Sequence, residues 1–312
     1  KGIFALWQDR TRMLAGFISE KGEVKLLCND DVCYIEDAAV TSDGENVIYV
    51  KTAENEACEV YLNGQKITDE TKAYKNKVLS RKKLVAWETN DGLEIEGVLS
   101  LPQDFDDKKK YPLLVVIHGG PTWASFPVHN MNRNYPIEQF VENGFIVLEP
   151  NYRGSTGYGS KFLTANYKML GIGDYEDVIS GVDMLIEKGI ADKERVGVMG
   201  WSQGGYISAF CSTYSNRFKA ISVGAGISDW MTYYVNTDIT TFTRQYLGSN
   251  PWKDPEIYAK TSPMTYIKSA CTPTLIQHGD KDRRVPVPNA FELYRGLKDM
   301  GVEAELVIFK GM

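Results

Sequence analysis

The chain has 312 residues, of which 43% are hydrophobic and 24% charged, and its formal net charge is −6. These values are ordinary for a globular protein and argue against disorder or a fibrous fold. Because the balance is mildly acidic and the basic clusters are short, no nucleic-acid partner is expected. No apolar run approaches the roughly 20 residues of a membrane-spanning helix, so no membrane segment is expected either.

The start of the chain and its cysteines leave the compartment open. The first residue is Lys1 and no signal-peptide pattern follows, so we expect a piece of a longer protein whose localisation stays unknown. The five cysteines contain no Cys-x-x-Cys pair, which predicts no metal site. Cys28 and Cys33 could pair in a secreted protein, although free, partly buried thiols fit the pattern better.

Residues 1–78 show strand patterns only. Four short apolar runs fall into two pairs, 13–18 with 24–27 and 47–50 with 60–62. The layout of turn, strand, turn and strand recurs after about 34 residues, as in the blades of a β-propeller. Because a propeller needs roughly four to eight blades, we predict that 1–78 is a partial β-propeller region of about two blades or fewer.

Residues 79–312 alternate between strand and helix patterns. A hairpin around Asn90-Asp91-Gly92 comes first. Strands are then expected at 113–118, 145–148, 196–199, 220–223, 274–277 and 305–309. Helices are expected at 136–143, 174–188 and 289–300 and directly after Ser202, with Asp174 and Asn289 as N-caps. Repeated β-α-β order demands a mostly parallel sheet with helices on both faces, so this region is predicted to be one α/β domain.

The most informative motif is Gly200-Trp201-Ser202-Gln203-Gly204-Gly205, a G-x-S-x-G pattern between an expected strand and an expected helix. A nucleophilic serine at such a corner needs a strained turn that lifts its hydroxyl clear of the sheet, and small residues on both sides prevent clashes. A glycine-rich turn without chemistry would produce the same letters. The flanking strand and helix favour Ser202 as a nucleophile, because that helix directs its positive end at a developing oxyanion.

A second motif, His278-Gly-Asp-Lys-Asp-Arg-Arg-Val-Pro286, follows a later strand. The acid of an α/β-hydrolase lies in such a loop, and Asp280 and Asp282 both qualify by position. A polar loop with a capping aspartate is the alternative.

A third motif, Val116-Ile117-His118-Gly119-Gly120-Pro121, ends the first long apolar strand. The backbone N–H of Gly120 is expected to form an oxyanion hole with that of Gln203, the residue after the serine. A plain tight turn is the alternative. His118 precedes the serine, which is the wrong order for a general base on this fold.

Four motifs in this order resemble the prolyl oligopeptidase family. They are His-Gly-Gly-Pro at 118–121, Asn-Tyr-Arg-Gly-Ser-Thr-Gly-Tyr-Gly at 151–159, Gly-Trp-Ser-Gln-Gly-Gly-Tyr at 200–206 and His-Gly-Asp-Lys-Asp-Arg-Arg-Val-Pro at 278–286. The resemblance is closest to acylaminoacyl-peptidases and dipeptidyl-peptidases and covers 84–312. It implies an α/β-hydrolase catalytic domain over 79–312, truncated before its C-terminus, after the end of a β-propeller.

The resemblance also assigns roles to single residues. It implies Asp282 as the catalytic acid and Arg284 as the group that holds a substrate carbonyl, although a solvated loop cation fits Arg284 equally well. The remaining substrate-binding positions, assigned to the pocket for the residue before the scissile bond, are Ile227, Trp230, Tyr233 and Val285. As a bare sequence, the aromatic cluster is more often protein core.

The family's general base lies after the last strand, and none of His118, His129 and His278 lies there. We therefore expect the base a few residues beyond Met312 and expect this fragment to hydrolyse poorly. The resemblance implies a serine peptidase that cleaves short oligopeptides through an acyl-enzyme, without metal or other cofactor, and it leaves room for a homo-oligomer. A carboxylesterase on the same fold and a non-catalytic binding relative stay open as alternatives.

Overall fold

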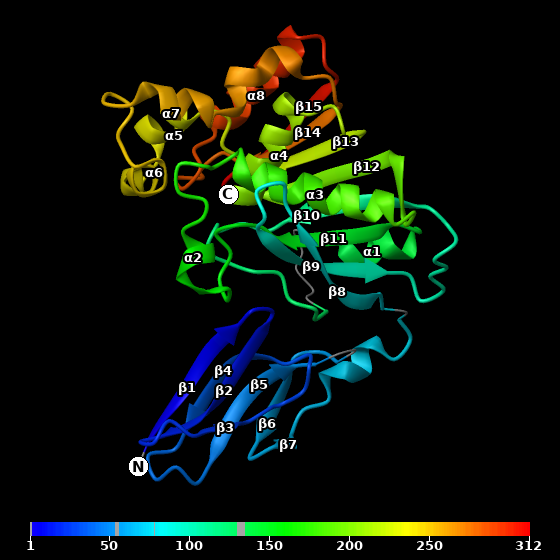
Figure 1. Ribbon diagram of the computed structural model, residues 1–312, viewed down its shortest axis with the longest axis vertical. Coiled ribbons are helices and arrows are strands. Elements are labelled where there is room, and N and C mark those ends of the chain that lie inside the picture. Colours follow the sequence, from blue (N-terminus) through cyan, green and yellow to red (C-terminus); the bar gives the residue numbers. More distant parts are fainter. Residues whose placement is uncertain (1, 54–55, 78, 130–134) are drawn as a thin grey trace.

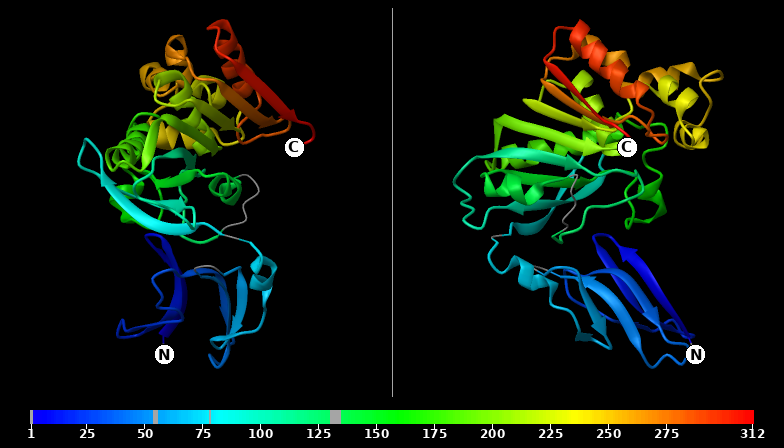
Figure 2. Two further views of the ribbon diagram at one scale, coloured as in Figure 1. Left: turned by 90° about the vertical axis from the view of Figure 1, so that its right-hand side faces the viewer. Right: turned by 180° about the vertical axis from the view of Figure 1, so that it is seen from behind.

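The computed structural model describes residues 2–53, 56–77, 79–129 and 135–312 and contains two separate β-sheets (Figure 1). The N-terminal sheet lies at one end of the molecule, and the larger α/β part lies at the other. The two views in Figure 2 show the same division from other sides. Within the described ranges, no helix combines the length and hydropathy that crossing a bilayer would require.

The N-terminal sheet consists of two antiparallel groups of strands. The first group is β1 (Gly2–Asp9), β2 (Arg12–Ser19) and β3 (Val24–Leu26). The second is β4 (Tyr34–Val40), β5 (Val47–Thr52), β6 (Glu59–Leu62) and β7 (Gln65–Lys66). A single parallel pairing, Met13 with Tyr34, joins them. A 3₁₀ helix, Glu70–Tyr74, follows. The domain boundary near residue 78 stays a prediction.

The second sheet has eight strands in the order β15-β14-β13-β12-β10-β11-β9-β8. The strand β9 (Glu94–Leu101) pairs antiparallel with both β8 (Arg81–Glu88) and β11 (Ile146–Asn151). The strands that pair in parallel are β10 (Tyr111–Ile117), β12 (Ala191–Trp201), β13 (Ala220–Gly224), β14 (Thr274–Gly279) and β15 (Ala304–Phe309). The strand β10 also pairs in parallel with β11.

Helices cover both faces of this sheet. The helix α1 (Ile137–Glu142) packs with Leu114 and Val116 on one face. The large core on the other face contains the alternate residues of β10 together with α3 (Gly173–Glu187), α4 (Gln203–Tyr214) and α8 (Pro288–Asp299). The remaining helices are α2 (Gly159–Leu163), α5 (Trp230–Asn236), α6 (Thr240–Leu247), α7 (Pro255–Lys260) and the 3₁₀ helix Pro263–Ser269.

Both predicted helix caps are wrong. The helix α3 begins at Gly173, so Asp174 lies inside its first turn, where its side chain is fully buried. The helix α8 begins at Pro288, because proline has no N–H to satisfy and its fixed φ suits a first helical position. Asn289 accepts a hydrogen bond from the Ser228 N–H at 3.1 Å instead. Asn289 therefore serves a contact with a distant part of the chain, whereas Asp174 is buried within the first turn of its own helix.

Candidate active site

Ser202 lies at the sharp corner between β12 and α4, as the motif predicts. Its backbone has φ 59° and ψ −119°, a combination that is strained for a residue with a side chain. The corner is held on both sides, because the Ser202 N–H donates to the Gly224 carbonyl of β13 at 2.9 Å and the Ser202 carbonyl accepts from Tyr206 at 2.8 Å. The surrounding contacts thus impose the conformation that a nucleophilic serine requires.

Close approach of backbones explains two glycines of this motif. A Cβ atom on Gly200 would overlap the carbonyl of Gly204, and one on Gly204 would overlap the Ile117 carbonyl at the end of β10. Strand and helix can therefore cross this closely only because both positions lack a side chain.

The predicted oxyanion loop lies beside the serine. A Cβ atom on Gly119 would lie 3.4 Å from Cβ of Ser202, which places the backbone after β10 next to the nucleophile. Gly120 follows with φ 127°, a conformation that favours glycine, and its bond to Pro121 is cis. Gln203 begins α4 and is almost fully buried. Gln203 thus follows Ser202 directly, and Gly120 follows the glycine that lies against it. Their role as oxyanion donors stays a prediction.

The segment 151–159, to which sequence analysis assigned no role, supports this loop. The Tyr152 hydroxyl donates to the His118 carbonyl at 3.0 Å, and Ser155 Oγ lies 3.0 Å from His118 Nε2. The Thr156 N–H donates to the Trp123 carbonyl at 3.0 Å. Burial lowers the pKa of His118 to about 4, so its imidazole is neutral near pH 7. His118 therefore supports the loop and is not placed as a base.

Asp282 lies in the turn after β14, at the same edge of the sheet as Ser202, because β12, β13 and β14 are parallel neighbours. Its Oδ1 accepts the N–H groups of Arg284 at 2.8 Å and Val285 at 3.0 Å. Its Oδ2 lies 3.9 Å from Nε2 of His278. One carboxylate oxygen therefore fixes the turn, and the other makes no hydrogen bond with the described residues.

The two candidate aspartates have different contacts. Asp280 Oδ1 accepts the Gly311 N–H at 2.7 Å, which ties this loop to the segment after β15. The buried His278 ring lies 2.6 Å from the Val285 carbonyl, and its burial lowers its pKa. Each aspartate therefore accepts backbone N–H groups through Oδ1, and neither Oδ2 makes a hydrogen bond with the described residues. The choice of Asp282 as the acid stays a prediction.

The predicted substrate-binding residues fall into two groups. Arg284 Nε lies 3.0 Å from Asp238 Oδ1, and the Arg284 side chain is 62% exposed. The buried ones are Ile227, Trp230, Tyr233 and Val285. Trp230 has no exposed surface and donates from Nε1 to the Thr261 carbonyl at 3.0 Å. The burial fits the core alternative, and a role in lining the substrate pocket stays a prediction.

The histidines of the chain are all engaged away from the serine. His129 Nδ1 lies 3.1 Å from Glu138 Oε1, and the other two rings have the partners given above. No hydrogen bond among the described residues joins Ser202 to a histidine. In the same ranges, no group of three His, Cys, Asp or Glu side chains is arranged to hold a metal ion.

A cavity of about 80 Å³ lies between the two sheets, behind the oxyanion loop. Its described lining residues include Tyr34, Trp123, Phe126 and Tyr135 but neither Ser202 nor Asp282. The cavity is therefore separate from the nucleophile.

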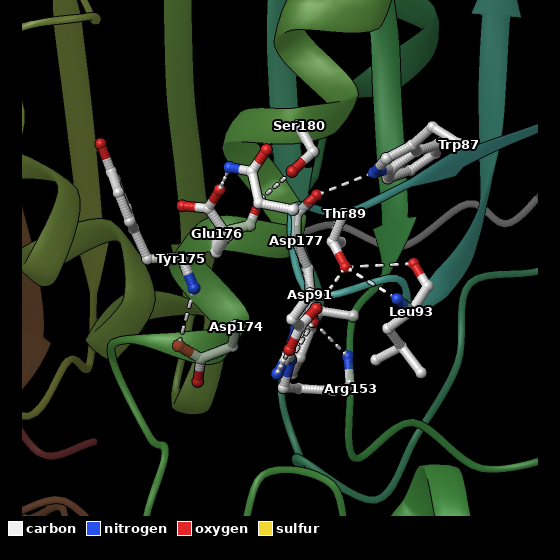
Figure 3. Close-up of polar contacts among 12 residues, drawn as sticks. Trp87, Thr89, Asp91, Leu93, Arg153, Asp174, Tyr175, Glu176, Asp177 and Ser180 are labelled. Atoms are coloured by element: carbon white, nitrogen blue, oxygen red, sulfur yellow. Dashed lines mark hydrogen bonds and ion pairs between the residues drawn. The ribbon is translucent and has the colours of Figure 1, made fainter.

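Arg153, in the segment 151–159, forms an ionic network with buried Asp177 and with the more exposed Asp91, which the sequence motifs did not predict (Figure 3). Its guanidinium donates to Asp177 of α3 at 2.7 Å and to Asp91 of the β8–β9 hairpin at 2.9 Å, and its backbone N–H donates to Asp177 at 2.7 Å. The hydrogen bonds from Arg153 hold the pKa of Asp91 at about 2. The network fastens the segment that supports the oxyanion loop to α3 and to the hairpin.

Asp174 lies one turn before Asp177 and has no such cation (Figure 3). Its Oδ1 accepts the Tyr175 N–H at 2.8 Å, whereas its buried Oδ2 has no hydrogen-bond partner among the described residues. Burial, reinforced by the charge of Asp177, raises the pKa of Asp174 to about 7.

Comparisons with known proteins agree with this arrangement. The model of the prolyl oligopeptidase family matches residues 133–312. YuxL, an uncharacterized peptidase of Bacillus subtilis, is 35% identical over 230 residues, which are 72% of this chain and 34% of that protein. The human acylamino-acid-releasing enzyme is 31% identical over 232 residues, 70% of this chain and 30% of that one. The chain thus spans about a third of the length of these curated relatives.

Solved structures give the same result over nearly the whole chain. The acylaminoacyl peptidase of Pyrococcus horikoshii matches with a TM-score of 0.87 at 29% identity. The match covers 98% of this chain and 49% of the Pyrococcus chain. An acylaminoacyl peptidase in complex with Z-Gly-Gly-Phe-chloromethyl ketone matches with a TM-score of 0.85 at 28% identity. That match covers 99% of this chain and 51% of the other chain.

The sheet order, the corner at Ser202 and these neighbours define an α/β-hydrolase domain preceded by a partial β-propeller region, which confirms the predicted fold class. The family match covers more than half of the chain. The chain therefore belongs to the prolyl oligopeptidase family, as its four motifs predicted.

The Arg153 network predicts a large loss of stability on Asp177→Asn. Arg153 and Asp177 are both buried, so the substitution removes the buried partner of the guanidinium and leaves only the more exposed Asp91. The free energy of unfolding should therefore fall by about 3 kcal/mol at pH 7. Asp183→Asn is the matched control on the same helix, because the pair of Asp183 with Arg217 is 39% exposed on both sides and should be worth less than about 1 kcal/mol. Urea unfolding followed by circular dichroism measures both, and equal losses would contradict a buried network.

Substitution of Asp174 should have the opposite effect on stability, and the size of the effect should depend on pH. Its pKa of about 7 lies above its ordinary value of 3.8, so the folded state keeps a proton that the unfolded state releases, and stability falls as the pH rises from about 4 to 7. Asp174→Asn mimics the neutral acid. At pH 8 the free energy of unfolding of the variant, measured by urea unfolding, should exceed that of the wild type by up to about 4 kcal/mol. This difference should disappear toward pH 4. A variant destabilised equally at both pH values would show that Asp174 is ionised in the folded protein.

Proposed function

We propose that this protein is a serine peptidase that cleaves short peptides by acyl transfer, with Ser202 as nucleophile and Asp282 as the acid of the triad. The observation that carries the proposal is the strained corner at Ser202, with the Gly119-Gly120 loop beside it and the Asp282 turn at the same edge of the sheet. Relatives named as acylamino-acid-releasing enzyme and as dipeptidyl-peptidase 5 support the peptide substrate.

In the proposed reaction, Ser202 Oγ attacks the scissile carbonyl carbon while a histidine takes the hydroxyl proton. The oxyanion accepts hydrogen bonds from the N–H groups of Gly120 and Gln203. Collapse breaks the C–N bond, the histidine returns its proton to the leaving amine, and water then hydrolyses the acyl-enzyme in the same two steps. Asp282 Oδ2 accepts the other N–H of that histidine and stabilises the imidazolium.

The base is a histidine other than the three in this sequence, because His118, His129 and His278 each have partners elsewhere. The exposed guanidinium of Arg284 is the proposed donor to a substrate backbone carbonyl. Asp238 holds that guanidinium at the rim of the site. No step calls for a metal or an organic cofactor.

Ser202→Ala tests the nucleophile. A fluorophosphonate probe should label Ser202 of the natural gene product, and Ser202→Ala should abolish the label, because only an activated serine attacks phosphorus at a useful rate. Ser160→Ala, at an exposed serine, is the control and should leave labelling unchanged. Gel fluorescence and peptide mass mapping give the readout, and undiminished labelling of Ser202→Ala would refute the assignment. Rates on a peptide anilide and on a p-nitrophenyl ester then distinguish a peptidase from a carboxylesterase.

Asp282→Asn tests the acid. The amide oxygen can still accept the two turn N–H groups, so the fold should survive, but a neutral side chain cannot stabilise an imidazolium. We expect kcat on a peptide anilide to fall by about 10⁴-fold. Asp280→Asn is the matched variant in the same loop and should lose less than about tenfold. The reverse order of the two effects would make Asp280 the catalytic acid.

A further inference from the structure

Tyr135 provides a contact between the oxyanion strand and the nucleophile corner. Its hydroxyl donates to the Ile117 carbonyl at 3.2 Å and accepts the Trp201 N–H at 2.9 Å. Ile117 is the last residue of β10, just before the His118-Gly119-Gly120 loop. Trp201 is the last residue of β12, just before Ser202. One hydroxyl therefore touches the backbones of both motifs at the point where they leave the sheet.

The position of this hydroxyl follows from the register of the two strands. The strands β10 and β12 pair in parallel as far as Ile117 opposite Gly200, and no further pairing is formed. Beyond that point the chain after β10 bends toward the serine, and the carbonyl of Trp201 would lie 3.1 Å from a Cβ atom on Gly119. The Tyr135 hydroxyl fills the place of the next rung, since it satisfies one carbonyl of β10 and one N–H of β12.

We propose that Tyr135 is a positioning residue that locks the oxyanion loop to the nucleophile corner, so that the distance between Ser202 and its oxyanion donors is fixed before substrate binds. This inference rests on the proposed function. Its physical basis is that oxyanion donors act through preorganised geometry, and a small increase in the separation of donor and nucleophile weakens the transition state more than the ground state.

The chemistry of the hydroxyl suits this role over the whole assay range. Burial raises the pKa of Tyr135 to about 12, so the phenol stays neutral and can donate one hydrogen bond while it accepts another. A phenylalanine at this position would keep the ring but leave the Ile117 carbonyl and the Trp201 N–H without this partner. Among the residues that the structure describes, the last strand pairing and the crowded glycines would then join the oxyanion loop to the corner.

The test compares Tyr135→Phe with Tyr111→Phe in the natural gene product. Tyr111 is the first residue of β10, at the end of that strand far from Ser202. Its hydroxyl accepts the Asp106 N–H at 2.9 Å. Tyr135→Phe loses two hydrogen bonds to backbone and Tyr111→Phe loses one, so a purely structural effect should lower the melting temperature of both variants without lowering kcat. The readouts are kcat and KM on a peptide anilide, the rate of fluorophosphonate labelling of Ser202, and the melting temperature.

We expect Tyr135→Phe to lower kcat and the labelling rate about tenfold, a change of about 1.4 kcal/mol in the barrier, with KM within about twofold of the wild type. Tyr111→Phe should leave kcat, KM and labelling unchanged. Unchanged kcat in Tyr135→Phe, a rise in KM alone, or equal losses in both variants would overturn the proposal.

Hydrogen exchange separates this inference from the proposed function. Loss of the hydroxyl should speed exchange of the Trp201 amide, and Tyr111→Phe should not. If Ser202 of the wild type is not labelled, the proposed function fails, and the exchange result still decides whether Tyr135 holds the corner. If labelling occurs and the Trp201 amide exchanges equally fast in wild type and Tyr135→Phe, the lock fails while the function stands.

Discussion

The crowding of three parallel strands at the carboxyl edge of the sheet is the constraint on which the rest of the site depends. Ser202 has a strained backbone that an isolated chain would not keep. The carbonyl of Gly224 on β13 and the turn of α4 hold it from one side, and the end of β10 approaches from the other. The register of β10, β12 and β13 therefore sets where the hydroxyl lies relative to the oxyanion loop.

The same site depends on contacts between segments that are distant in the chain. The segment 151–159 binds the oxyanion loop through Tyr152 and Ser155 and is itself anchored to α3 by Arg153. The segment also accepts a hydrogen bond from the N-terminal region, because the Arg10 N–H donates to the Gly157 carbonyl at 2.9 Å. This segment thus contacts both the propeller region and the oxyanion loop.

Sequence alone could predict the parts of the site that depend on local geometry. The glycines around Ser202 and the turn after β14 carry their constraints within a few residues, so the nucleophile and the two candidate aspartates could be named. The supports could not, because Tyr135 and Arg153 act on partners 66 and 24 residues away. The predicted caps failed because Asp174 is buried inside the first turn of its helix and Asn289 bonds to Ser228, 61 residues away. The strands β1 and β4 were missed because few of their residues are fully buried, which leaves little alternation to detect.

A crystal structure of the natural gene product after reaction with a fluorophosphonate would show whether Ser202 is the nucleophile and which groups bind the oxyanion. We expect phosphorus bonded to Ser202 Oγ, with one phosphoryl oxygen within hydrogen-bonding distance of the Gly120 and Gln203 N–H groups and a histidine between the adduct and Asp282. Phosphorus on another residue, or a phosphoryl oxygen turned away from both amides, would contradict these assignments.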